Sequence, residues 1–154
     1  MASHYAVLQG RFMLALDIQH VRMKQHATDK AQALQCLVDI LVEDQLVTPD
    51  YIHGLTAREQ QSATYLGQGI AIPHGTPQSR QSILKTGIRL AHFPEGVVWD
   101  GENKIYLAVV IAAKSDEHLQ VLQILTRALI NDVADQVKQA QSAEQIIALL
   151  QAQP

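Results

Sequence analysis

The sequence has little that suits a disulfide-stapled, membrane-spanning or nucleic-acid-binding protein. Its 154 residues include a single cysteine, which excludes an internal disulfide framework. No apolar run approaches the roughly 18 residues of a membrane-spanning helix. The N-terminus lacks the charged head and long apolar stretch of a signal peptide. The net charge of −3 offers no basic footprint for nucleic acid. We therefore expect one soluble globular domain in a reducing compartment.

The first third of the chain predicts two helices. Apolar residues recur at helical spacing from Ala31 onward, and Thr28 followed by Asp29 suits the cap and the first turn of a helix. Thr48 followed by Pro49 is typical of a second helix opening, because threonine caps exposed amides and proline fits the first turn. We expect this second helix to end at about residue 58 or 60.

The middle of the chain predicts strands. An apolar strand at 70–72 must end at Pro73, which has no amide hydrogen to donate to a sheet. The stretch 87–93 alternates apolar and polar residues, and the Pro-Glu-Gly at 94–96 indicates a turn. The run 105–113 is nearly all apolar and rich in β-branched residues, which predicts a central strand covered on both faces.

The last third of the chain is again helical in pattern. Ser115 suits the cap of one helix, a short helix is expected near 132–140, and a capping box at 142–145 opens a final helix. Helical stretches thus flank the strand region on both sides in the sequence. The natural packing of this order is an α/β fold, a three-layer α/β/α sandwich.

Histidine is abundant, with seven in the chain, and one of them stands out by position. His74 follows an apolar strand and Pro73, and it precedes Gly75. Proline stiffens the backbone before the histidine, and glycine leaves the following amide uncluttered. An imidazole held in this way suits a nucleophile or the acceptor of a dianionic group. The alternative is a histidine in a turn that caps backbone groups.

His118 and Arg58 are two further candidates for binding an anion. If Ser115 caps a helix, His118 lies in its first turn, where exposed amides favour negative charge. Arg58 lies near the end of the second predicted helix, and its planar guanidinium matches the oxygens of a phosphate. Taken alone, each of the two also fits a solvated surface residue.

Other chemistries find little support in the sequence. The Gly67-x-Gly69 pair lacks the third glycine of a dinucleotide fingerprint, and no Walker lysine or Gly-x-Ser-x-Gly elbow is present. Cys36 lies on the apolar side of the first predicted helix and is expected in the core. The remaining histidines show no metal-ligand spacing and are interpreted as surface or packing residues: His4, His20, His26, His53 and His92.

Several separated blocks of the sequence form a recognisable series: AREQQ at 57–61, TYLG at 64–67, GIAIPHGT at 69–76, LKTG at 84–87, FPEGV at 93–97 and DEHL at 116–119. In this order they resemble the enzyme IIA domain of the bacterial sugar phosphotransferase system, of the mannitol/fructose type. The resemblance covers most of the chain from about residue 13. We therefore interpret 13–154 as a type-2 EIIA domain and 1–12 as a leader or extension.

The resemblance implies a phosphoryl carrier with a mixed sheet between helical layers. His74 matches the family's phosphorylated histidine, His118 its second active-site histidine and Arg58 its active-site arginine. The phosphoryl group would come from the histidine phosphocarrier protein, or from a fused domain like it. It would pass to a cysteine of the cognate IIB domain, which phosphorylates the sugar as the sugar crosses the membrane through IIC. The resemblance implies no cofactor, no metal and a cytoplasmic location.

The subtype rests on two of these blocks. The segments 57–61 and 93–99 are most similar to the fructose-specific IIA domain of the diphosphoryl transfer protein, and the mannitol type is next. A regulatory module, in which phosphorylation of His74 switches partner binding as in the nitrogen-type relatives, is an alternative from a different class. A histidine-rich metal-binding domain is a third.

Overall fold

A mixed five-stranded sheet lies at the centre of the computed structural model, which describes residues 5–8, 11–14, 16–116, 119–120, 122–123, 127 and 132–151. Its strands in spatial order are β3 (Val21–Arg22), β6 (Gly87–Asp100), β7 (Asn103–Ala112), β5 (Ile70–Ala71) and β4 (Tyr65–Gly67). The β6–β7 and β4–β5 pairs are antiparallel, whereas β3–β6 and β5–β7 are parallel. The mixed sheet expected from the resemblance is confirmed.

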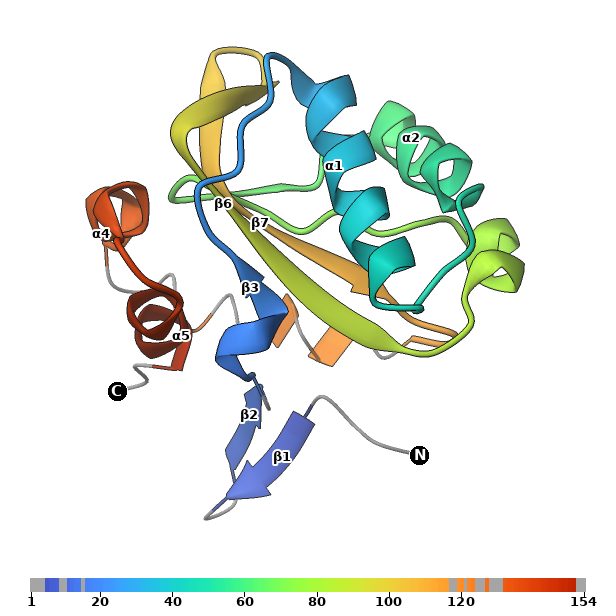
Figure 1. Cartoon of the computed structure of the whole chain (residues 1–154), viewed down its shortest axis with the longest axis horizontal. Helices are drawn as coiled ribbons and strands as arrows, with labels where there is room; N and C mark the ends of the chain where they lie inside the picture. The colour runs from blue at the N-terminus through green and yellow to red at the C-terminus, as the bar shows by residue number, and fades with distance from the viewer. Residues whose placement is uncertain are drawn as a thin grey trace.

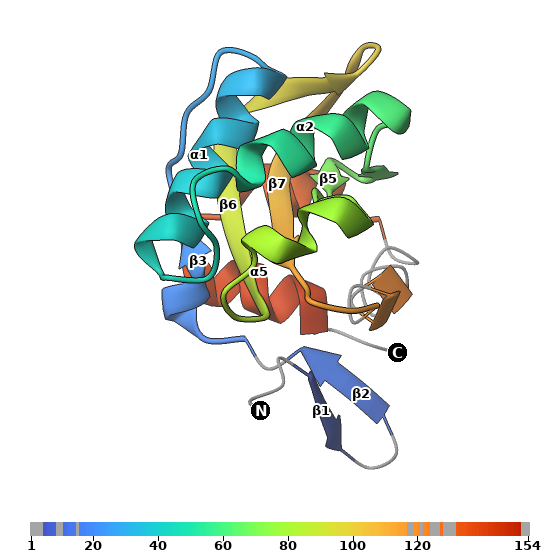
Figure 2. The ribbon, with the colours of Figure 1, turned by 90° about the vertical axis from the view of Figure 1, so that its right-hand side faces the viewer.

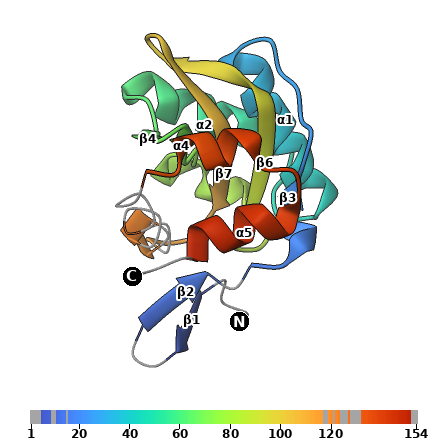
Figure 3. The ribbon, with the colours of Figure 1, turned by 90° about the vertical axis from the view of Figure 1, so that its left-hand side faces the viewer.

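Helices cover both faces of this sheet (Figures 1 and 3). On one face lie α1 (Lys30–Glu43) and α2 (Tyr51–Gln61), and on the other lie α4 (Ala134–Gln139) and α5 (Ala143–Gln151). The described residues also include two short 3-10 helices, η1 (Ile18–His20) and η2 (Pro77–Ser82). The three-layer α/β/α arrangement predicted from the sequence is therefore confirmed. None of the helices in the described part of the chain is long and apolar enough to cross a bilayer.

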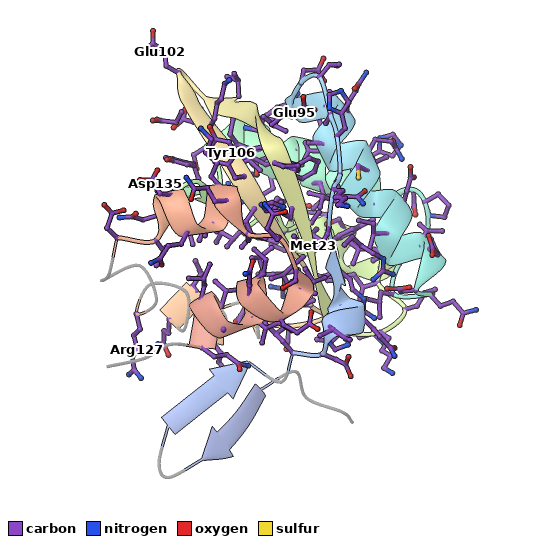
Figure 4. All side chains as sticks on the ribbon, turned by 60° about the vertical axis from the view of Figure 1, so that its left-hand side comes forward. Met23, Glu95, Glu102, Tyr106, Arg127 and Asp135 are labelled. Atoms are coloured by element: carbon purple, nitrogen blue, oxygen red, sulfur yellow. The ribbon has the colours of Figure 1, made fainter. Side chains whose placement is uncertain are left out.

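Strand β7 is buried on both faces, as the apolar run at 105–113 predicts. Val110 packs into the cluster beneath α1 and α2, whereas its neighbour Val109 packs into the cluster beneath α4 and α5. Each face of the strand therefore supports a separate hydrophobic core. Figure 4 shows side chains filling the space between the sheet and the helices, while Glu102 projects from the tip of the β6–β7 connection.

The predicted start of the second helix is corrected by the structure. The helix α2 begins at Tyr51, and the residues before it form a turn in which the Tyr51 amide donates to the Thr48 carbonyl at 3.1 Å. Among the described residues, no side chain caps the start of α2 by a hydrogen bond, and the Thr48 hydroxyl donates to the Asp50 carboxylate. The cap of α1 is also corrected, by one residue: Asp29 takes the place predicted for Thr28, and its carboxylate accepts from the Gln32 amide at 2.9 Å.

The turn predicted at 94–96 is wrong, because β6 continues through these residues to Asp100. The pairing of β6 with β7 shifts register between His92 and Val97, which accommodates exposed Pro94 without a missing ladder bond. Gly96 has a φ of +79°, and a Cβ there would lie 2.8 Å from the Tyr106 ring. The Pro-Glu-Gly signal therefore marks a bulge within a long strand.

A separate antiparallel hairpin precedes the body. Its strands are β1 (Tyr5–Leu8) and β2 (Arg11–Leu14), and they pair only with each other in the part of the chain described. All three ribbon views place this hairpin beside the body, outside the three layers (Figures 1 to 3). Its second strand crosses the boundary between residues 12 and 13 that the sequence analysis proposes.

Candidate active site

A pocket of about 270 Å³ opens where α2, the segment after β5, η2 and the end of β7 meet. Figure 2 views the molecule from the side on which α2 and η2 lie across β5 and β7. The structure brings two of the three predicted residues into the wall of this pocket, namely His74 and Arg58. The third, His118, lies outside the described residues.

His74 is half-buried and is held by the backbone of the sheet. The Ile111 amide donates to the Pro73 carbonyl at 2.9 Å, and His74 itself forms an isolated parallel bridge with Ile111. The His74 Nδ1 lies 2.9 Å from the Ile72 carbonyl oxygen. A carbonyl only accepts, so Nδ1 must carry the proton, and the neutral ring then has its lone pair on Nε2.

Tyr51, which the sequence analysis missed, anchors this strand end to α2. Its buried phenol oxygen accepts from the Gly75 amide at 2.9 Å and donates to the Ile111 carbonyl at 2.9 Å. Burial raises the pKa of Tyr51 to about 12, so the phenol keeps its proton at any physiological pH. Nothing in the sequence around Tyr51 distinguishes it from an ordinary aromatic residue on a helix.

Gly75 is required for a different reason from the one predicted. Its amide is not left open, because it donates to the Tyr51 hydroxyl. A Cβ at position 75 would lie 2.2 Å from the Ser79 hydroxyl and 2.8 Å from the Tyr51 ring. Glycine therefore allows α2 and η2 to close around the backbone that follows His74.

Arg58 lies in the last turn of α2 and makes a local contact. Its Nη1 donates to the Ser62 carbonyl at 2.7 Å, so the guanidinium satisfies a carbonyl just past the helix end. The same side chain lines the pocket. The surface interpretation of Arg58 and the anion-binding one are therefore compatible, because a guanidinium has five donor hydrogens.

Arg80 and Asp116 form an ion pair in the same pocket, and the sequence analysis singled out neither of them. The Arg80 Nη2 donates to the Asp116 carboxylate at 2.9 Å, and the two side chains are 34% and 74% exposed. Arg80 belongs to η2, for which the sequence analysis predicts no element. Thr76 followed by Pro77 was the available signal, because Thr76 caps η2 with a hydroxyl that accepts from the Ser79 amide at 3.2 Å, and Pro77 begins the helix.

Two other residues from the sequence analysis lie away from this pocket. His92 is buried, and its Nε2 donates to the Val137 carbonyl at 2.7 Å, which fits the packing role predicted for it. Cys36 is half-buried and packs against the core beneath α1, and burial raises the pKa of its thiol. Among the described residues, no cluster of histidine, cysteine or carboxylate side chains is placed to hold a metal ion.

The arrangement suits an anion that carries more than one negative charge. Two guanidinium groups, from Arg58 and Arg80, line a pocket that also contains an imidazole with its lone pair on Nε2. Guanidinium groups match the oxygens of a phosphoryl group, and the imidazole is a nucleophile for phosphorus. The chemistry that these groups support together is phosphoryl transfer to His74.

The chain is similar in sequence to one family of known proteins. Residues 15–153 match the sequence model of the family described as "Phosphoenolpyruvate-dependent sugar phosphotransferase system, EIIA 2". The chain is 46% identical over 139 residues to the multiphosphoryl transfer proteins of Vibrio cholerae and of Escherichia coli O157:H7. It spans 90% of its own length in each match but only 35% and 37% of these relatives. It is also 41% identical over 130 residues to the mannitol-specific EIICBA component of Pasteurella multocida, covering 82% of the chain and 21% of that protein.

Solved structures resemble the fold over most of its length. The mannitol IIA of Escherichia coli is 33% identical with a TM-score of 0.80, and the match covers 88% of this chain and 98% of that one. A complex of mannitol enzyme IIA with phosphorylated enzyme IIB from the same organism matches with 32% identity and a TM-score of 0.80, covering 88% and 96%. The nitrogen regulatory IIA protein of Neisseria meningitidis, at 23% identity and a TM-score of 0.72 over 87% and 94% of the two chains, shares the fold.

Proposed function

The chain belongs to the EIIA 2 family of the phosphoenolpyruvate-dependent sugar phosphotransferase system, and from this we propose that it carries the phosphoryl group on His74. The observation that supports this choice of residue is the bond from Nδ1 to the Ile72 carbonyl. With the proton on Nδ1, the lone pair on Nε2 can act as the nucleophile. His74 lines the same pocket as two guanidinium groups.

The transfer step needs no additional base, because no proton has to leave the attacking ring. The Nε2 lone pair of His74 forms a bond to phosphorus while the bond from phosphorus to the donor's histidine nitrogen breaks. The electron pair of the broken bond remains on the donor's nitrogen, and the donor ring becomes neutral. The His74 ring gains positive charge while Nδ1 keeps its proton, so its bond to the Ile72 carbonyl becomes charge-assisted and stronger.

Arg58 has the role of a clamp on the phosphoryl oxygens in this proposal. Charge in phosphoryl transfer spreads over three equatorial oxygens in a loose, in-line transition state, so positioning and electrostatic stabilisation dominate. The position of Arg58 on α2 in the pocket wall supports this role. His118 is proposed as a second donor to the same oxygens on the strength of the sequence resemblance.

The proposed partners are the histidine phosphocarrier protein, or a fused domain like it, and the cognate IIB domain. A cysteine of IIB would accept the group and pass it to the sugar as the sugar moves through IIC. The solved complex of a mannitol IIA with phosphorylated IIB supports the IIB step. We also propose that these exchanges take place in the cytoplasm, where the proposed phosphocarrier partner would be found.

Fructose is the sugar that we propose for this system. Support comes from the segments 57–61 and 93–99 and from the identity to multiphosphoryl transfer proteins. Mannitol is the second candidate, because a mannitol-specific EIICBA component is 41% identical to the chain over 130 residues. Transfer from the phosphorylated chain to purified fructose IIB and mannitol IIB, compared at equal concentrations, distinguishes the two sugars.

The phosphorylated residue is tested by mass spectrometry of the intact protein. Incubation with phosphoenolpyruvate, enzyme I and phosphocarrier protein should add one acid-labile phosphoryl group, about 80 Da. His74→Ala should abolish the adduct. His53→Ala, which removes an exposed histidine of α2 outside the pocket, should retain it and serves as the control. An adduct that persists in His74→Ala would overturn the assignment.

A further inference from the structure

We propose that Arg80 is a second guanidinium that binds the phosphoryl group on His74, and that Asp116 holds Arg80 until that group arrives. This inference rests on the proposed function and deepens it. Arg80 on η2 binds the phosphoryl group, and the Asp116 carboxylate competes with that group for Arg80. Arg80 thereby exchanges one anionic partner for another in each cycle of transfer.

The position of Arg80 is fixed by packing on the same element that follows His74. The Ser79 amide and hydroxyl both bond to Thr76, at 3.2 and 2.8 Å, which defines the start of η2. Ser79 also lies so close to α2 that a Cβ on Gly54 would be 2.3 Å from it. Arg80 and Arg58 therefore extend from two elements in direct contact, and both line one pocket.

Charge balance in the pocket explains why a second guanidinium is needed. Among the described lining residues, Arg58 and Arg80 carry positive charge and Asp116 carries negative charge. A phosphoryl group on His74 brings further negative charge close to the Asp116 carboxylate. Like charges repel at this range, whereas a guanidinium with five donors binds phosphoryl oxygens through two of them at once.

The pair between Arg80 and Asp116 is weak enough to be exchanged. Asp116 is 74% exposed, and exposed ion pairs contribute little because water screens them. Arg80 is only 34% exposed, so its interaction with a dianion inside the pocket is screened less. A dianion therefore outcompetes the carboxylate, while the carboxylate keeps the phosphoryl group from being bound too tightly for onward transfer.

The test follows the phosphoryl group directly by phosphorus NMR. The protein is phosphorylated on His74, and the pKa of its phosphoryl group is measured by titration. Arg80→Gln should raise this pKa by about 1 unit or more, because a cation that favours the dianion is lost. Arg80→Lys should restore part of the shift, because lysine keeps the charge but lacks the fork. Lys85→Gln removes an exposed charge outside the pocket, so its phosphoryl group should have the same pKa as that of wild type.

A double-variant cycle tests the exchange itself. Asp116→Asn should lower the phosphoryl pKa and slow onward transfer, because Arg80 is then released to the phosphoryl group. In the Arg80→Gln background the same change should have a clearly smaller effect, since the two side chains act through one contact. Phosphoryl uptake by Arg80→Gln should also fall at least about tenfold while circular dichroism shows a folded protein.

The outcomes separate this inference from the proposed function. If wild type takes up no phosphoryl group on His74, both are overturned. If wild type is phosphorylated and Arg80→Gln titrates identically to it, only the role of Arg80 is overturned. An effect of Asp116→Asn that is equal with and without Arg80 would overturn the exchange.

Discussion

At the scale of single residues, one phenol oxygen joins the backbone that follows the candidate nucleophile to the neighbouring strand β7. Tyr51→Phe leaves the Gly75 amide and the Ile111 carbonyl without their partner. We expect a loss of about 1–3 kcal/mol in the free energy of unfolding, measured in urea, and slower phosphorylation of His74. Tyr65→Phe, a half-buried tyrosine that packs against the same core, is the control. Equal stability of Tyr51→Phe and wild type would contradict this role.

The pKa of Asp44 predicts how the stability of the fold changes in acid. Burial alone raises the pKa of Asp44, but hydrogen bonds from Arg89 and Arg22 outweigh it, so the pKa lies below its ordinary value of 3.8. A lowered pKa means that the carboxylate contributes stability above the unfolded-state pKa and loses it as the pH falls through the lower, folded-state value. Asp44→Asn should be less stable than wild type at pH 7 by about 1–3 kcal/mol.

The difference between Asp44→Asn and wild type should begin to shrink as the pH falls below about 4, because Asp44 of the unfolded chain then binds a proton that the folded protein binds only at lower pH. Urea unfolding at a series of pH values measures this difference. A difference that stays constant from neutral to acid pH would show that the charge of Asp44 does not stabilise the fold.

How well single residues can be predicted depends on how local their signal is. His74 is identifiable because proline and glycine on either side mark it as a strand end. Tyr51 and Arg80 act through contacts with residues 24 and 36 positions away, and no local pattern encodes such distances. Arg58 was predicted from its chemistry, whereas its bond to Ser62 required the geometry of the helix end.

At the scale of elements, the contact between α2 and η2 determines the shape of the pocket. Gly54→Ala places a methyl group 2.3 Å from the Ser79 Cβ, so the two elements must separate. We expect a loss of about 1–3 kcal/mol in stability and slower phosphorylation, because both arginines of the pocket shift. Thermal unfolding and uptake of the phosphoryl group measure the two effects.

Ser79→Gly provides the matched control for this contact. It removes the side chain that the new methyl group at position 54 would meet, so the double variant Gly54→Ala, Ser79→Gly should recover part of the lost stability. Additive losses in the double variant would mean that the close approach is not the cause.

The elements themselves follow from sequence pattern more reliably than their ends. The two faces of β7 were predicted from local residues and are confirmed, whereas the cap of α1 is Asp29, one residue after the predicted Thr28. The start of α2 also lies later than predicted, because residues 48–50 form a turn before the helix begins at Tyr51. The turn at 94–96 failed because the pairing with β7, a long-range interaction, continues the strand past the bulge.

At the scale of the whole molecule, the hairpin β1–β2 lies outside the three layers (Figures 1 and 3). An isolated two-stranded hairpin is marginally stable at best, and the family match begins at residue 15. Removing residues 1–14 should therefore change the free energy of unfolding by no more than about 0.5 kcal/mol and leave phosphorylation of His74 unchanged. A large loss of either would show that the hairpin supports the body.

The burial of strand β7 affects which parts of the molecule unfold locally. Strand β7 is covered on both faces, and the backbone at His74 is joined to it through Ile111. Amide hydrogens in such a strand exchange with solvent only through near-global unfolding. The candidate nucleophile is thus joined to a strand that we expect to open slowly, while Asp116 lies at the exposed margin of the pocket, where a partner could bind without loosening the imidazole.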